Sequence, residues 1–211
     1  MFALLALLGY LIGSVPMAWA LTWASTGRDL RRLGSGNVGV MNVALSVGRW
    51  AGLIVFAGEA GKGVAAVALA RALGGSNLQL GVAALAVVAG TRWPIWLGGA
   101  GGRGNTAGAA ALSLISWPAL AAFGVIWIAA RWVSGNHFTA TRAAFLTWPL
   151  AFGLIQSSWT LALFSGAICA LYLSMHDRKT DDHLLLKQRW PSLWAFLSAP
   201  ARGSERPLIG K

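Results

Sequence analysis

Charged side chains are scarce in this sequence. They make up 11% of its 211 residues, while hydrophobic residues make up 56%. An average globular protein carries about 25% charged residues, and the mean hydropathy here is +0.62. A chain with so little charge cannot cover a large apolar surface in water, so we expect an integral membrane protein.

Cysteine, histidine and acidic residues are also few. The chain has one cysteine, Cys169, three histidines and six Asp and Glu residues. A single cysteine excludes an intramolecular disulfide and a thiolate metal cluster, and the dispersed carboxylates offer no dense oxygen cage for a cation. A G-x-S-x-G elbow, an H-E-x-x-H helix and a Walker loop are absent too. We therefore expect no metal and no cofactor.

Positive charge dominates what charge there is. The chain has 17 Lys and Arg residues, a formal net charge of +11 and a pI near 11.5. A nucleic-acid-binding protein would carry such charge on a solvated face beside a soluble core. Here the cations lie at the ends of apolar runs. This distribution indicates a protein in a lipid bilayer and not a nucleic-acid partner.

Apolar segments recur along the whole chain and predict an all-α integral membrane protein, a compact bundle of about seven transmembrane helices. A full crossing needs about 20 residues, and fewer where the bilayer thins. Several segments are shorter, and the third is able to continue through Pro94. We predict spans at 2–23, 50–70, 78–89, 106–116, 118–133, 143–156 and 159–175.

The cations follow alternate gaps between these spans. Fifteen of the 17 lie in or beside residues 24–49, 90–105, 131–142 and 176–211, whereas the other gaps are short and nearly uncharged. Because cytoplasmic loops carry an excess of Lys and Arg, we predict an outside N-terminus and a cytoplasmic C-terminus. Residues 1–180 would form the membrane domain and 181–211 a basic cytoplasmic tail.

Two glycine-rich loops fall on the predicted cytoplasmic side, GSGNVGVMN (34–42) and GGAGGRGNT (98–106). Glycine lets backbone N–H groups approach an anion, and a helix is expected to begin after each loop, so a helix N-terminus would point at the same place. Arg103 and the cluster of Arg28, Arg31 and Arg32 add positive charge. The loops therefore indicate a phosphate site, although glycines also serve simply to pack helices.

A carboxylate and an amine lie inside the second predicted span, at Glu59 and Lys62. Single charges are costly in lipid, and a spacing of three residues places both on one helix face. We expect a buried structural ion pair, with direct substrate contact as the alternative.

Three hydroxyl and imidazole side chains are candidates for chemistry near the predicted cytoplasmic face. Ser134 and His137 lie in a predicted loop, and His176 follows the last span. A Ser–His relay also needs an orienting group and an oxyanion hole, and the sequence indicates neither.

Four motifs occur in order: GSVP (13–16), RRLGSGNVGVMNV (31–43), GEAGKG (58–63) and GTRWPIWLGGAGGRGNTAG (90–108). Over about residues 9–180 the chain resembles the bacterial membrane glycerol-3-phosphate acyltransferases that take acyl-phosphate as donor, the PlsY family. The first glycine loop of that family reads G-S-G-N-[IV]-G-A-T-N-V. It is matched here by Gly34, Ser35, Gly36, Asn37, Gly39, Asn42 and Val43.

The resemblance implies a seven-span enzyme of the bacterial inner membrane with its site at the cytoplasmic face. It implies acyl transfer from acyl-phosphate to the sn-1 hydroxyl of glycerol-3-phosphate, which gives lysophosphatidic acid for phospholipid biosynthesis without a covalent acyl-enzyme or a metal. The implied catalytic residues are Ser35, Asn37, Arg103 and Ser134. The implied phosphate-binding residues are Gly34, Gly36, Asn42, Gly101, Gly102, Gly104 and His176.

The chain also departs from the family pattern. Met41 replaces a threonine and removes a hydroxyl, and Leu45 replaces an arginine and removes a cation that would fork onto phosphate oxygens. Arg103 replaces a lysine, keeps the charge and gains the fork. Of the family's last element, only His176 and Arg178 can be aligned. Val40, Thr91 and Ala100 also differ from the residues that the family has at these motif positions.

A protein of a different class would share several of these features. Glycine-broken helices and cationic loops also occur in transporters, so a non-catalytic homologue that binds or moves a phospholipid or an anion is the alternative. The clustering of the loops on one predicted face, instead of at the bilayer midplane, favours the enzyme.

Overall fold

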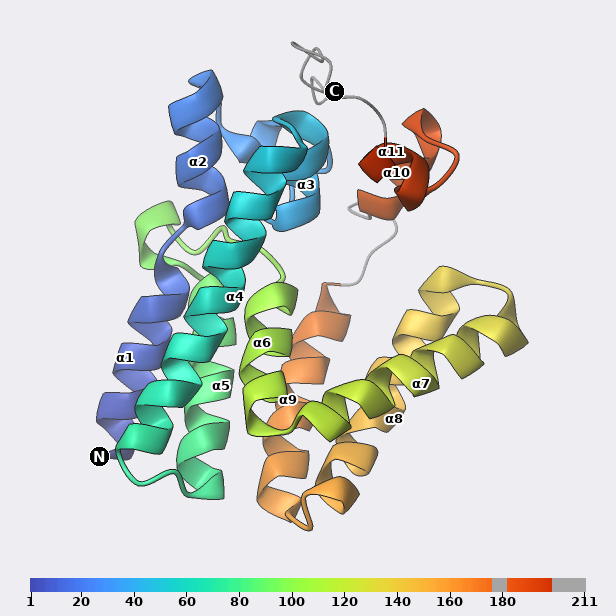
Figure 1. Ribbon diagram of the computed structural model, residues 1–211. Coiled ribbons are helices and arrows are strands. Elements are labelled where there is room, and N and C mark those ends of the chain that lie inside the picture. Colours follow the sequence, from blue (N-terminus) through green and yellow to red (C-terminus); the bar gives the residue numbers. More distant parts are fainter. Residues whose placement is uncertain (176–181, 199–211) are drawn as a thin grey trace.

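The computed structural model describes residues 1–175 and 182–198 (Figure 1). Regular secondary structure in these residues is helical, which confirms the all-α prediction. The helices are α1 (Phe2–Ser14), α2 (Met17–Thr26), α3 (Val40–Ser46), α4 (Arg49–Ala72), α5 (Asn77–Arg92), α6 (Asn105–Ile115), α7 (Trp117–Ser134), α8 (His137–Ile155), α9 (Trp159–Ser174), α10 (Asp182–Arg189) and α11 (Leu193–Ser198), with short 3₁₀ turns η1 (Leu30–Arg32) and η2 (Ile95–Leu97).

Five helical segments of the described chain are long and apolar enough to cross a bilayer; the first joins α1 and α2, and the third joins α5 and η2. The five are Phe2–Thr26, Arg49–Ala72, Asn77–Leu97, Trp117–Ser134 and His137–Ile155, and the third does continue past Pro94. Helices α6 and α9 are apolar but shorter. Together these segments overlap the seven predicted spans. The number of crossings and the inside and outside assignments stay predictions.

Polar side chains at the short turns set the helix ends. Ser76 and Gln79 form a reciprocal capping box at the start of α5, which satisfies two backbone donors that the first turn leaves free. Ser116, Asn136 and Ser158 each accept backbone N–H bonds at the starts of α7, α8 and α9. The polar residues between the apolar segments therefore serve as N-cap residues that begin the next helix.

The first predicted span is broken in the structure into α1 and α2. Pro16 has no N–H to donate, so the chain cannot continue the hydrogen bonding of α1. The carbonyl oxygens of Gly13 and Val15 instead accept bonds from Nζ of Lys62, at 3.1 and 3.0 Å. A lysine of α4 thus closes the break between α1 and α2.

The central core is formed by α1, α4, α5, α6 and α9, with α5 contacting each of the others. Close approach depends on small residues. A Cβ atom on Gly90 would lie 2.1 Å from the Tyr10 carbonyl oxygen, and one on Gly63 would lie 2.1 Å from that of Ala107. The missing side chains of Gly90 and Gly63 therefore let α5 pack on α1 and α4 on α6.

Helices α7 and α8 form an antiparallel hairpin that leans away from the core (Figure 1). The hairpin corrects one sequence expectation: Ser134 ends α7 and His137 begins α8, so a sharp turn replaces the predicted loop and α8 starts six residues before the predicted span. Asn136 makes this possible because its Oδ1 accepts the N–H of Phe138 at 2.9 Å.

Helices α10 and α11 lie beside α3 (Figure 1). Leu186 and Phe196 form an apolar cluster with Leu45 of α3, and Trp190 packs against it. We call α10 and α11 the C-terminal cap. The boundary predicted at residue 180 therefore separates two parts of the sequence that pack together.

Candidate active site

The first glycine loop is held in shape by Asn42. This side chain is completely buried, and its amide group donates to the carbonyl oxygens of Leu33 and Asn37 at 3.0 and 2.9 Å. Its Oδ1 accepts from the backbone N–H of Ser35 at 3.3 Å. Gly34, at φ +53°, passes so close that a Cβ would lie 2.1 Å from this oxygen. Asn42 thus organises the loop, which differs from the predicted direct contact with phosphate.

The loop presents two side-chain donors to an anion. Oγ of Ser35 donates to Oδ1 of Asp182, and Nδ2 of Asn37 donates to Oδ2 of the same carboxylate at 3.2 Å. Asp182 is the first residue of α10 and is 7% exposed. The two carboxylate oxygens accept hydrogen bonds from a hydroxyl and an amide, and two oxygens of a phosphate would be able to accept the same bonds. The pattern of the loop is therefore that of an anion site.

The second glycine loop closes against the first. The N–H groups of Gly101 and Gly102 donate to the carbonyl oxygens of Arg92 and Thr91, both at 3.2 Å. A Cβ on Gly102 would lie 2.1 Å from the carbonyl oxygen of Val38 in the first loop. These two glycines thus serve close backbone packing, and their N–H groups are committed to α5, contrary to the predicted role in cradling phosphate.

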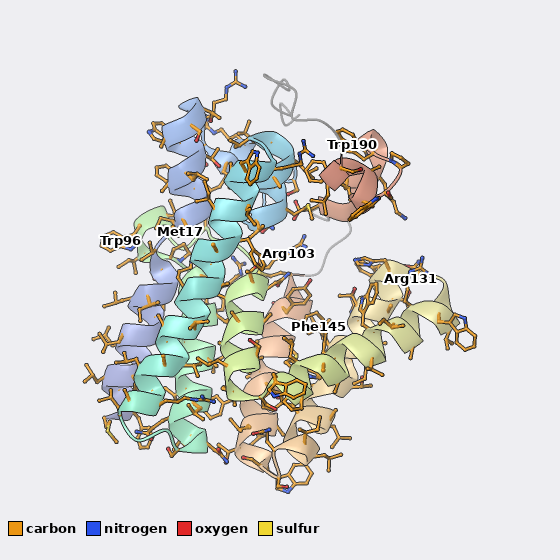
Figure 2. All side chains as sticks on the ribbon, in the orientation of Figure 1. Met17, Trp96, Arg103, Arg131, Phe145 and Trp190 are labelled. Carbon is orange, nitrogen blue, oxygen red and sulfur yellow. The ribbon has the colours of Figure 1, made fainter. Side chains whose placement is uncertain are left out.

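Arg103 and Gly104 bring the second loop to a cleft of about 260 Å³. Gly104, at φ +74°, is the N-cap of α6, so the first turn of that helix faces the cleft. Figure 2 shows Arg103 at the end of α6 nearest α3 and the cap. A guanidinium beside a helix N-terminus favours an anion. The cleft lining comprises Asn37, Val38, Gly39, Val40, Met41, Glu59, Thr91, Arg103, Gly104, Asn105, Thr106 and Asp182.

An apolar groove of about 60 Å³ adjoins the cleft. Arg103, Gly104 and Asn105 line both spaces, so the guanidinium lies where polar and apolar surfaces meet. From there the groove runs between side chains of α5 to α9. Its apolar lining includes Val88, Leu112, Leu120, Phe123, Phe145, Trp148, Ile168 and Tyr172.

Glu59 and Lys62 form the ion pair that the sequence predicts. Their charged atoms are 2.7 Å apart, and each side chain is 8% exposed. Lys62 also donates to α1, as described above, whereas Glu59 lines the cleft. The pair therefore ties the wall of the cleft to the break between α1 and α2.

Other predicted residues lie elsewhere. Ser134 is exposed at the tip of the α7–α8 hairpin, where it bonds with Asn136, and it does not line the cleft. Figure 2 shows Arg131, one turn earlier, far from Arg103. His176 lies outside the described residues.

The predicted cationic cluster is divided in the structure. Arg31 pairs with Asp29 at 2.6 Å, and its hydrogen bonds hold the pKa of that carboxyl below the ordinary value. Arg28 and Arg32 line a separate open surface with Trp23. The cluster therefore contributes to the η1 turn and to the protein surface, while Arg103 supplies the cation of the cleft.

Sequence reasoning missed Asp182 as a contact of the first loop. The available signal was weak: an acidic residue in an otherwise basic predicted tail, after an element that departs from the family pattern. The structure also shows where two other departures lie. Leu45 and Met41 pack with Leu186 and Phe196 of the cap. These apolar contacts with α3 hold α10 in the position from which Asp182 contacts the cleft.

The fold and the cleft together define a helical membrane protein with a polar cleft, lined by Arg103 and the two glycine loops, at one end of its bundle. Residues 3–184 match the family described as "Glycerol-3-phosphate acyltransferase". The chain therefore belongs to the glycerol-3-phosphate acyltransferase family, and it is an integral membrane enzyme of that family.

Individual relatives agree with this assignment. The chain is 34% identical to the glycerol-3-phosphate acyltransferase of Desulforamulus reducens, over 80% of this chain and 84% of the relative. It is 38% identical to that of Rubrobacter xylanophilus, over 75% and 78%. Among solved structures, PlsY (YgiH), an integral membrane glycerol 3-phosphate acyltransferase in its glycerol 3-phosphate form, superposes with a TM-score of 0.72 at 25% identity, covering 89% of this chain and 93% of that one.

Proposed function

We propose that this protein transfers a fatty acyl group from acyl-phosphate to the sn-1 hydroxyl of glycerol-3-phosphate, which yields lysophosphatidic acid and inorganic phosphate. The observation that carries this proposal is the position of Arg103, where the polar cleft and the apolar groove meet. An acyl-phosphate has the same division, with its reacting carbon between a phosphate and a hydrocarbon chain.

The polar cleft would hold the phosphates. Ser35 and Asn37 supply neutral donors, and Arg103 supplies a planar cation that suits phosphate oxygens. Gly104 lets the first turn of α6 face the same anion. At about 260 Å³ the cleft has room for a small polar molecule, which suits the strongly polar acceptor beside a donor phosphate.

The apolar groove would take the start of the acyl chain. At about 60 Å³ the groove is smaller than the cleft, so we assign to it only the first part of a long acyl chain. Helix α7, which lends Leu120 and Phe123 to the groove, also carries the exposed hydrophobic residues Val125 and Ile128. The rest of the chain would therefore lie in the bilayer, from which the donor enters.

The chemistry places modest demands on the protein. Acyl-phosphate is an activated donor, so bringing the acceptor hydroxyl next to the acyl carbon supplies much of the rate enhancement. Negative charge develops on the acyl oxygen during attack, and a donor fixed beside it stabilises that charge. Arg103 is the residue of the cleft that fits this role. Neither step needs a metal or a covalent acyl-enzyme. We place the enzyme in the bacterial inner membrane, with the cleft facing the cytoplasm.

The direct experiment is a product assay. Purified protein with palmitoyl-phosphate and labelled glycerol-3-phosphate should form lysophosphatidic acid. Ser35→Ala and Asn37→Ala should each lower kcat/KM by about tenfold to a hundredfold, the value of one hydrogen bond to a charged group. Ser174→Ala is the matched control, because it removes an exposed hydroxyl that bonds within its own helix.

Two outcomes would contradict the proposal. Binding of glycerol-3-phosphate without product formation would favour the non-catalytic homologue. Unchanged kinetics in both the Ser35 and Asn37 variants, with product still formed, would show that the phosphates bind elsewhere.

A further inference from the structure

Asp182 occupies the donors that the proposed function gives to a substrate phosphate. Ser35 and Asn37 donate to its two carboxylate oxygens. A hydroxyl carries one hydrogen, so Ser35 cannot donate to Asp182 and to a phosphate at the same time. The carboxylate and the phosphate therefore exclude each other at Ser35.

The cap fixes Asp182 in this place through apolar packing. Leu186 follows Asp182 by four residues, so both side chains lie on one face of α10. Leu186 is 2% exposed and packs with Leu45 and Phe196. Burial of that leucine against α3 orients the helix so that its first residue meets the glycine loop.

A second contact holds the far end of the cap. Nη1 of Arg49 donates to the carbonyl oxygens of Phe196 and Leu197, at 3.1 and 2.7 Å. These carbonyls belong to the last turn of α11, which has no further helical N–H groups to pair with. Arg49 lies outside the cleft lining, so it holds the cap without contacting the proposed substrate.

The charges of the cleft disfavour a state in which the Asp182 carboxylate and a substrate phosphate bind side by side. Glu59 is neutralised by Lys62, which leaves Arg103 and Asp182 as the opposite charges of the described lining. A phosphate that entered beside Asp182 would meet a like charge, which is unfavourable in a partly buried site. Substrate therefore has to displace the carboxylate from the loop.

We propose that Asp182 is an internal competitor for the phosphate site and sets the affinity of the enzyme for its phosphate-bearing substrates. Its carboxylate holds Ser35 and Asn37 in the absence of substrate, and substrate phosphate replaces it. This inference rests on the proposed function of the glycine loop, because it assigns the same two donors to both anions.

The test separates the substrate affinity from the chemical step. Asp182→Ala should lower KM for glycerol-3-phosphate, and lower the inhibition constant of inorganic phosphate, by about tenfold or more, since each released donor is worth at least that factor. It should leave kcat at or above the wild-type value. Asp182→Asn keeps the size but removes the charge, so its effect should be in the same direction and smaller. Gln188→Ala, an exposed change on the same helix, is the control.

Arg49→Ala provides a second, independent perturbation. It weakens the hold on α11 without touching the cleft, so it should also lower KM for glycerol-3-phosphate. This variant keeps the inference testable if Asp182→Ala lowers the melting temperature enough to prevent kinetics.

Several results would overturn the inference. A fall in kcat or a rise in KM for Asp182→Ala would show that the carboxylate helps the reaction, and an unchanged KM would show that it does not compete. These results differ from failure of the proposed function. The two donors are therefore also removed in the Asp182→Ala background, where no carboxylate competes for them. If Ser35→Ala and Asn37→Ala raise KM in that background while Asp182→Ala itself does not lower it, only the competition is wrong; if none of these changes alters KM, the phosphate site itself is wrong.

Discussion

Replacing Lys62 by alanine should destabilise the protein strongly. The change leaves the Glu59 carboxylate without its cation in a position where its side chain is 8% exposed. It also removes the donor to the Gly13 and Val15 carbonyl oxygens at the break between α1 and α2. Removing one partner of a buried pair costs about 3–5 kcal/mol. At about 2–4 °C per kcal/mol for a chain of this size, the melting temperature should fall by about 6–20 °C.

The buried cysteine offers the assay. Cys169 is the only cysteine of the chain and is 2% exposed, so a thiol-reactive fluorophore should label it only when the helices separate. Heating detergent-solubilised protein with that fluorophore would give the melting curve. Lys187→Ala is the control, because it also removes one cation but at an exposed site on α10.

A double variant distinguishes the charge from the packing. Glu59→Gln with Lys62→Met removes both charges and keeps side chains of similar size, so it should melt well above Lys62→Ala. The reasoning would be refuted if Lys62→Ala melted within about 2 °C of the wild type, which corresponds to less than about 1 kcal/mol. It would also be refuted if the double variant were no more stable than the single one, because the isolated carboxylate would then not be the cause.

The remaining predictions concern the cleft and the topology. Arg103→Ala should lower kcat/KM by about tenfold to a hundredfold, and Arg103→Lys by less, because lysine keeps the charge but cannot bind two phosphate oxygens at once. Arg28→Ala should change kcat/KM little. Equal losses for Arg103→Ala and Arg28→Ala would mean that the region is only a general cationic surface. Cysteine introduced at Leu73 should react with an impermeant label from outside the cell, and cysteine introduced at Gln188 only after the membrane is opened; the reverse pattern would contradict the orientation.

Much of the bundle could be predicted because each span carries its own signal. Hydropathy locates α4, α5, α7 and α8, and the Glu59–Lys62 pair follows from helical spacing and the cost of charge in lipid. The break at Pro16 was missed because the apolar run continues on both sides of it. Proline alone does not end a membrane segment, since other groups can satisfy the freed carbonyls, and Lys62, which does so here, is 46 residues away.

The candidate site was harder to predict because it depends on contacts between distant segments. The sequence identified Ser35, Asn37 and Arg103 by type and loop context, and the structure brings Asn37 and Arg103 to one cleft. The sequence could not show that the side-chain amide of Asn42 donates to the loop backbone, or that the N–H of Gly101 donates to the end of α5. Glycine and asparagine patterns indicate a special backbone, but the direction in which each N–H points is settled only by tertiary packing.

The lipid-facing position of α7 affects which substitutions this sequence can accept during evolution. Only 6% of its apolar window is buried inside the protein, against 50% for the window of α5. Lipid tails adapt to any side-chain shape, whereas α5 meets backbone at Gly90 with no room for a methyl group. Selection on Val125 and Ile128 should therefore preserve hydropathy alone, so that valine, isoleucine, leucine and phenylalanine interchange there, while the small residues of α5 stay fixed.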